Sequence, residues 1–198
     1  MAAPQVTAQV TSKDEKYTKA AEAIFHLLLQ AGIPAVTHAR VSRSSKISRG
    51  WLYKYIGKNR EDLITFGIDY FGKIFIELDV QAAAPKNKQE FFDFFVAGTE
   101  RMLSYTLIYP WIIPIYFQFR ASKSVVGERI RKISDAYLTR QMKELQPLFK
   151  IDAKEARICA EVLGGMRLGL GFNYQVTGLH QKIDGKTLSE AVGRFIKI

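Results

Sequence analysis

A helix-start pattern that recurs along the chain constrains the fold more than any other feature. A short polar side chain precedes a glutamate by three residues at four places: Ser12 with Glu15, Asn87 with Glu90, Asp152 with Glu155, and Thr187 with Glu190. Each pair can satisfy backbone N–H groups that the first turn of a helix leaves without partners. Since no segment shows sustained strand alternation, the sequence predicts an all-α chain.

Apolar periodicity between Gly and Pro breaks places the helices. We expect them at 13–30, 36–44, 48–55, 61–81, 87–109, 111–120, 124–149, 153–176 and 187–197. The uncharged run 102–119 approaches the length of a membrane-spanning helix. Pro110 and Pro114 interrupt it, so two helices separated by a turn are predicted there and no membrane span.

Positive charge is concentrated near the N-terminus. The formal net charge is +10, and residues 1–60 hold 10 Lys and Arg against 3 Asp and Glu, whereas residues 61–198 hold 19 against 16. This asymmetry predicts a polyanionic partner for the N-terminal part, nucleic acid first and an anionic membrane surface second.

The basic region has the layout of a helix-turn-helix. Thr37 is a suitable N-cap for a short helix that buries Val41, and Ser48 is a suitable N-cap for a second one after the turn 45–47. We therefore predict a three-helix DNA-binding domain at 1–60, with residues 1–12 flexible, and a larger helical domain at 61–198 for ligand binding and dimerisation.

Helical rotation assigns roles within the second short helix. With Leu52 turned inward, Gly50 and Lys54 point outward, at about 100° per residue. Base-edge contacts are expected from Arg49, Gly50 and Lys54, and phosphate contacts from Thr37, Arg43, Ser48, Tyr53 and Lys58. Trp51 is left between two interpretations, contact with the DNA groove and packing within its own fold.

This segment resembles the TetR family of bacterial transcriptional regulators. The family signature is a Thr followed eleven residues later by a Ser, then Leu-Tyr-x-Tyr/His-aromatic and a basic–acidic stretch ending in Leu. Here the matching positions are Thr37, Ser48, "LYKYI" at 52–56 and "NREDLI" at 59–64. The chain departs from the pattern in three ways: Lys46 replaces the usual Gly of the turn, Ile56 replaces Phe, and one extra residue precedes Leu63.

Aromatic side chains are dense between residues 66 and 119, and many of them have polar tips. A helical core explains most of them, and a pocket for an apolar or amphipathic small molecule is the functional interpretation. The resemblance to TetR proteins implies an inducer site within this helical bundle. The candidate lining residues are Phe66, Tyr70, Phe95, Tyr105, Tyr109, Trp111, Tyr116 and Phe117.

Small residues at helical spacing predict close packing of another helix near residue 165. The candidate dimer-interface residues are Ala160, Gly164, Gly165 and Gly169. A glycine-rich nucleotide loop is excluded by the lack of a preceding strand and of the G-x-G-x-x-G spacing. The resemblance implies dimerisation through the last two long helices, here 153–176 and 187–197.

Catalysis, cofactors and metals have little support in the sequence. The three His residues are scattered, and Cys159 is the single cysteine, which fits a reducing, cytoplasmic setting. No secretory signal is visible, so export is not expected. We expect a non-enzymatic, ligand-responsive transcriptional regulator, a repressor that binds a palindromic operator as a homodimer. The alternative is a basic helical protein that binds RNA or a membrane surface without an effector.

Overall fold

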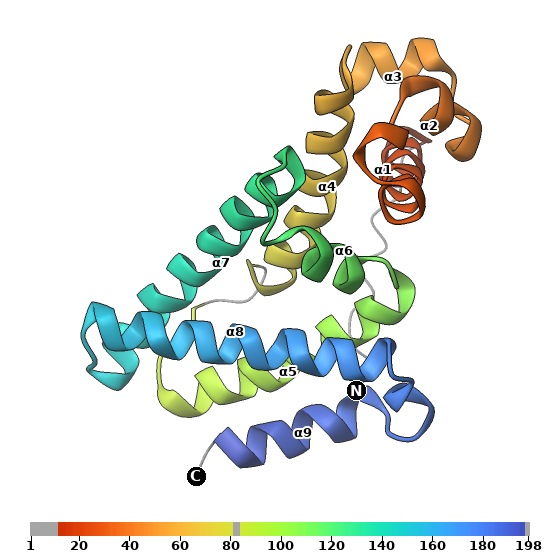
Figure 1. The fold of residues 1–198 in the computed structure, drawn as a ribbon. Helices are drawn as coiled ribbons and strands as arrows, with labels where there is room; N and C mark the ends of the chain where they lie inside the picture. The colour runs from red at the N-terminus through yellow and green to blue at the C-terminus, as the bar shows by residue number, and fades with distance from the viewer. Residues whose placement is uncertain (1–11, 81–83, 197–198) are drawn as a thin grey trace. The chain divides into compact units, whose positions relative to one another are not determined.

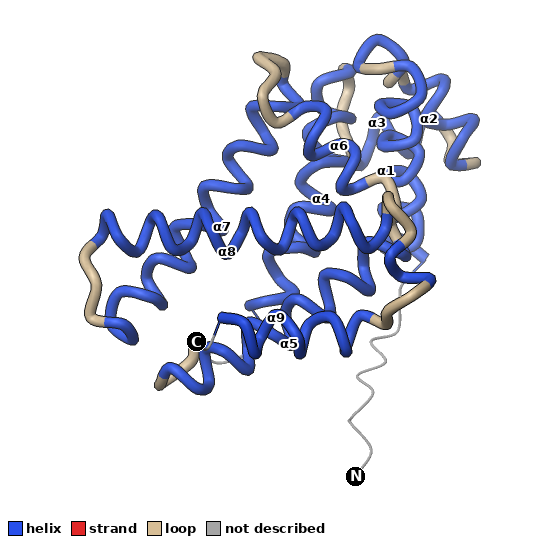
Figure 2. The backbone as a smooth tube through the Cα atoms, turned by 60° about the horizontal axis from the view of Figure 1, so that its bottom comes forward, coloured by secondary structure: helices blue, strands red, loops and turns tan. Residues whose placement is uncertain are grey.

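The computed structural model describes residues 12–80 and 84–196, with side chains for all of these except 73–80 and 196. Within these residues all regular structure is helical (Figure 2). The elements are α1 Ser12–Ala31, η1 Ile33–Ala35, α2 His38–Ser45, α3 Arg49–Tyr55, α4 Arg60–Val80, α5 Lys88–Ile108, α6 Ile112–Phe119, α7 Val125–Phe149, α8 Ala153–Gln175, η2 Leu179–Gln181 and α9 Gly185–Ile196. The prediction of an all-α chain is therefore confirmed. Position 81 of the expected fourth helix, and the expected flexibility of 1–11, lie outside the described residues.

Two of the four predicted helix starts have the expected cap. Asn87 accepts the amide of Glu90 at 2.9 Å, and Asp152 accepts that of Glu155 at 2.8 Å. Thr187 was the wrong choice for the last helix, because α9 already begins at Gly185. There Asp184 accepts the Thr187 amide at 2.9 Å. Ser12 is itself helical, and the position before it lies outside the described residues.

The chain forms two compact units that divide between Tyr70 and Phe71, inside α4 (Figure 1). The sequence analysis placed the boundary between the two functional domains after residue 60, which is the start of α4, and that boundary stays a prediction. Periodicity locates the ends of a helix, but a division within a continuous helix leaves no Gly or Pro signal to read.

The first unit has a small core built from α1, α2, α3 and the start of α4. Leu28, Val41, Leu52 and Leu63 are fully buried in it. At Gly67, α4 comes so close to α1 that a Cβ would lie 2.9 Å from the Ile24 side chain. The short helices α2 and α3 thus rest on a packed base, which fixes the direction in which their outer faces point.

In the second unit, α5 lies between α8 and α9, and α7 packs along α8 (Figure 1). The uncharged run behaves as predicted: α5 ends at Ile108 and α6 begins at Ile112 after a turn that contains Pro110. Among the described residues, none of the helices has an apolar stretch of sufficient length to cross a bilayer.

Candidate nucleic-acid interface

The turn between α2 and α3 is held by side chains on both sides. The Thr37 hydroxyl accepts the amide of Arg40 and the Ser48 hydroxyl that of Trp51, each at 3.3 Å, which confirms both predicted caps. The Ser45 hydroxyl donates to the Val41 carbonyl at 2.7 Å and accepts the Ile47 amide at 3.3 Å. Two helices joined by so tight a turn form a helix-turn-helix.

The rotation of α3 is the one expected from the sequence. Leu52 is fully buried, whereas Arg49, Gly50 and Lys54 are exposed. A Cβ built on Gly50 meets no atom within 4 Å, so a flat partner can approach the α3 backbone there. A Gly in a helix interior costs about 1 kcal/mol against Ala, and a close contact is a physical reason to keep one.

The outer face of this motif is rich in positive charge. No Asp or Glu occurs between Ala23 and Arg60. Its exposed cations come from α2, the turn, α3 and the following loop: Arg40, Arg43, Lys46, Arg49, Lys54 and Lys58. The sequence analysis did not select Arg40 and Lys46, although the absence of acidic residues over this stretch was a visible signal for both. Such a face suits the phosphate backbone of a nucleic acid.

Tyr53 is 46% exposed, and His38 supports its ring. The two rings stack with centroids 4.1 Å apart, and His38 itself is buried. The Nε2–H of His38 donates to the Gly57 carbonyl at 2.8 Å, which fixes the ring plane. The exposed Tyr53 ring is thus held in position by a buried imidazole, which suits a phosphate contact.

Trp51 packs within its own unit. Its ring lies 5.2 Å from that of Tyr17 and 5.0 Å from that of Tyr55, measured between centroids. Lys13 lies over Tyr55 at 5.0 Å, so α1 covers this flank of α3. Trp51 is half-buried by these contacts, and its contact with the DNA groove stays a prediction.

The loop before α4 accommodates the extra residue of the motif. Gly57 has φ +156°, and a Cβ there would collide with the Asp62 side chain. Asp62 accepts the amides of Lys58 at 2.7 Å and Asn59 at 3.1 Å. These bonds, with the Asn59 amide as the largest cause, hold the pKa of the Asp62 carboxyl below its ordinary value. Lys58 is therefore held on the outer face despite the altered spacing.

A groove of about 630 Å³ lies between α1 and the α2–α3 turn. Its lining is mixed in charge, with Lys16 and Lys19 from α1, Lys46 from the turn, and Glu15 and Glu22. Glu15 forms an ion pair with Lys19. Among the described residues there is no cluster of His, Cys, Asp or Glu that could hold a metal ion.

The predicted pocket residues fall into several separate groups. Phe66 and Tyr70 belong to the first unit, where Tyr70 forms a 2.7 Å hydrogen bond with Thr18. Tyr105, Tyr109 and Trp111 form a continuous aromatic group with Phe71.

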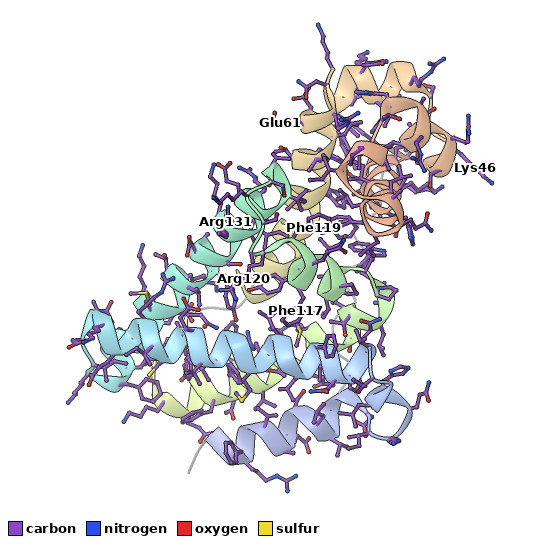
Figure 3. All side chains as sticks on the ribbon, in the orientation of Figure 1. Lys46, Glu61, Phe117, Phe119, Arg120 and Arg131 are labelled. Carbon is purple, nitrogen blue, oxygen red and sulfur yellow. The ribbon has the colours of Figure 1, made fainter. Side chains whose placement is uncertain are left out.

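Phe95 lies in another part of the second unit, beneath the guanidinium of Arg167, 4.2 Å from the ring centroid. Phe117, which Figure 3 labels, is 53% exposed. Its ring lies 5.5 Å from that of Tyr116 and 5.7 Å from that of Phe172. Periodicity shows which face of a helix a residue occupies, but it does not show which residues of other helices lie beside it. The sequence therefore could not separate these groups of aromatic residues.

Arg167, which the sequence analysis missed, forms a buried polar cluster with α5 and α7. Its guanidinium donates to the Thr99 hydroxyl at 3.1 Å, the Tyr137 hydroxyl at 2.6 Å and the Phe95 carbonyl at 2.9 Å. The Gln141 amide donates to the same Tyr137 hydroxyl at 2.6 Å, and its Oε1 has no partner. A buried cation surrounded by hydroxyl and amide groups is costly unless every polar atom is paired.

The small residues of α8 face two different directions. Ala160 is fully buried, and a Cβ on Gly164 would contact Leu138 and Tyr137 of α7. A Cβ built on Gly165 or on Gly169 would meet no atom from another element within 4 Å. They belong to an apolar strip about 80° wide at 100° per residue. This strip, here called the α8 stripe, consists of Ile158, Val162, Gly165, Gly169, Phe172 and Val176.

Known proteins share this fold at low sequence identity. The fatty acid degradation regulator FadR from Bacillus halodurans is 14% identical, with a TM-score of 0.67, over 90% of this chain and 96% of that one. FadR from Bacillus subtilis, solved in complex with stearoyl-CoA, is 18% identical, with a TM-score of 0.65 and the same coverages. The TetR family repressor AlkX from Dietzia sp., implicated in biodegradation of n-alkanes, is 17% identical, with a TM-score of 0.50, over 91% and 92%.

Neither a protein-family model nor a curated protein matches the sequence. The likeness to solved structures is one of fold. Within the described residues the chain shares the all-helical fold of these structures, and its helix-turn-helix lies in the N-terminal part.

Proposed function

We propose that this protein is a cytoplasmic DNA-binding transcriptional regulator. The observation that carries the proposal is the surface of α2, α3 and their loops, where six cations are exposed, no Asp or Glu occurs between Ala23 and Arg60, and the backbone of Gly50 is open. Arg49 and Lys54 read base edges in the major groove, and Thr37, Arg43, Ser48, Tyr53 and Lys58 contact phosphates.

The regulator works as a homodimer. The α8 stripe supports this, because Ile158 and Val162 are 55% and 62% exposed and Phe172 is 39% exposed. Exposed apolar side chains in one continuous strip are typical of a protein–protein contact. Pairing two copies through a two-fold axis presents two α3 helices to successive major grooves, so the operator is a palindrome.

The effector is an apolar or amphipathic small molecule that binds in the second unit and releases the DNA, which makes the protein a repressor. Support comes from the aromatic group around Trp111 and from the similar FadR structure that contains stearoyl-CoA. A long-chain acyl compound is the class to test first. Release requires that the effector bind the DNA-free conformation more tightly than the DNA-bound one.

Selection of bound duplexes from a random DNA pool tests the DNA-binding proposal. We expect a palindromic consensus whose half-sites lie one helical turn, about 34–36 Å, or a multiple apart. Equal retention of single-stranded RNA or of anionic vesicles would instead support the alternative, a basic protein without a sequence-specific operator.

Thermal unfolding with added ligand tests the effector. Stearoyl-CoA should raise Tm and lower the affinity for the selected duplex, whereas coenzyme A without an acyl chain should do neither. The same measurements with stearate show whether the acyl chain alone, without the nucleotide part of stearoyl-CoA, has this effect. A Tm that none of these compounds changes would contradict the proposed effector class and leave the DNA-binding proposal standing.

A further inference from the structure

Two residues other than Gly have a positive φ among the described residues, and both are lysines. Lys46 follows α2 with φ 58°, and Lys150 follows α7 with φ 56°. The left-handed conformation brings the Cβ of an L-residue against its own backbone, so Gly is the usual residue at this position after a helix. A lysine there needs a reason.

The surrounding turn does not depend on the residue at 46. Ser45 and Ile47 are buried on either side, and the Ser45 hydroxyl bridges the Val41 carbonyl and the Ile47 amide. These contacts fix the left-handed geometry from outside Lys46. Replacing Lys46 by Gly therefore keeps the turn and removes only the side chain and its steric strain.

Lys46 is one of the exposed cations of the helix-turn-helix. It lies on the loop after α2, at the outer edge of the first unit (Figure 3), three residues from both Arg43 and Arg49. It is exposed, and it forms no ion pair with any carboxylate among the described residues. Like charges crowded at this spacing repel one another unless an anion lies over them.

The groove beside Lys46 limits where that anion lies. Lys46 lines it together with Lys16, Lys19, Glu15 and Glu22, so the groove carries both signs of charge. On the outer face of α2 and α3, by contrast, no Asp or Glu occurs between Ala23 and Arg60, and a DNA strand that follows this face meets Lys46 among cations. We propose that Lys46 contacts a backbone phosphate of the operator. The inference rests on the proposed DNA-binding function.

Lys46→Gly separates strain from contact. We expect Tm to rise by about 2–4 °C, because the strain is lost. Affinity for the selected duplex should fall by about tenfold for a dimer, and the slope of log K against log salt should become shallower by about 1.8, or two phosphate contacts.

Three variants make the test specific. Lys46→Arg should keep wild-type affinity, because it keeps the charge. Lys46→Ala should lose affinity without the rise in Tm, because Ala also has a Cβ in the strained conformation. Lys150→Gly is the matched control: it relieves the same strain in the second unit, so Tm should rise while affinity and salt slope stay unchanged.

Wild-type affinity and salt slope in both Lys46→Gly and Lys46→Ala would overturn the contact. A drop in affinity of Lys150→Gly equal to that of Lys46→Gly would overturn it too, because turn strain alone would then explain the loss. If the wild-type protein selects no duplex at all, the proposed function itself fails, and the two failures are thus distinguishable.

Discussion

Helices α3 and α8 each expose a glycine, but the side chains around the two glycines are charged on α3 and apolar on α8. Gly50 on α3 and Gly165 on α8 each have room for a Cβ with nothing within 4 Å. Around Gly50 the exposed neighbours are Arg49 and Lys54, whereas around Gly165 they are apolar, with Val162 62% exposed. An exposed glycine indicates that a partner can approach the helix backbone. The charge or apolar character of the neighbouring side chains indicates which kind of partner it is.

The comparison also separates what each surface can tolerate. A phosphate backbone is bound by charge and is sensitive to salt, whereas a helix-to-helix contact depends on apolar area and close packing. A charge added to the α8 stripe should therefore abolish its contact with a second copy. A methyl group added to an exposed glycine should weaken partner binding on both α3 and α8.

Gly165→Lys should have the largest effect. In a two-fold dimer each copy places its new charge against the other apolar strip, so desolvation and repulsion both oppose pairing. We expect a monomer by light scattering and a loss of operator affinity of at least about a hundredfold, since the two half-sites are then bound independently.

Thr139→Lys is the matched control, because it adds the same charge at an exposed position of α7 away from the α8 stripe. This variant should remain a dimer with wild-type affinity. If Gly165→Lys remained a dimer, the α8 stripe would not be part of the dimer interface, and its exposed glycine would not mark a contact with a second copy.

Arg49→Ala should have the second largest effect. The side chain is exposed on α3 beside Gly50, in position to reach a base edge. We expect a loss of about 1–3 kcal/mol in binding free energy and a relaxed preference at one base pair of each half-site. Selection of duplexes with the variant measures both.

Arg194→Ala on α9 is the control, because it removes an equally exposed arginine from the second unit. Its selected consensus should be that of the wild type. An unchanged consensus for Arg49→Ala would mean that Arg49 contacts phosphate and that base reading belongs to another residue.

The sequence was sufficient to predict most of the fold because helix boundaries have local causes. The caps at Thr37, Ser48, Asn87 and Asp152 depend on one side chain and one amide three residues away. The error at α9 has the same origin: Asp184 and Thr187 are both good caps, and the earlier one is used. Local sequence preference does not decide which of two capping residues three positions apart begins the helix.

The candidate site was only partly predictable, because the missing parts depend on tertiary contacts. The outward face of α3 followed from one buried residue, Leu52. By contrast, the stacking of Tyr53 on His38 joins two helices, and the cluster around Arg167 joins three. Spacing along one helix carries no information about a neighbour from another. The same limit scattered the predicted pocket residues.

Gly50→Ala should sharpen the comparison at the level of one methyl group. Ala stabilises an exposed helix by about 1 kcal/mol over Gly, and nothing in the fold opposes the new Cβ. If DNA approaches the backbone here, the methyl should weaken binding by roughly 1 kcal/mol or more. The protein would then be more stable and bind less tightly.

Gly165→Ala is its counterpart on α8. It should raise the stability of the isolated chain by a similar amount and weaken dimerisation, measured by sedimentation, while the selected base preference stays unchanged. Equal DNA affinity of Gly50→Ala and the wild type would show that the α3 backbone is not closely approached.

The smallest expected effect concerns the loop that holds Lys58 beside the cationic face. Asp62 accepts two loop amides, which lower the pKa of its carboxyl in the folded protein. Because the folded pKa is below the unfolded one, its contribution to stability is fully present above the ordinary aspartate pKa. It is lost as pH falls through the folded pKa. The amide resonances of Lys58 and Asn59 should therefore titrate with a midpoint below 3.8, the ordinary value for this carboxyl.

Asp62→Asn should remove that titration and slightly weaken DNA binding at neutral pH, because the loop before α4 loses its charged acceptor. Asp184→Asn is the matched control: the pKa of Asp184 is also lowered, chiefly by the Thr187 hydroxyl, but the residue caps α9. It should change the Thr187 amide and leave DNA binding intact. Equal losses of DNA affinity in the two variants would mean that general destabilisation is the cause, and that the α3–α4 loop has no special part in binding.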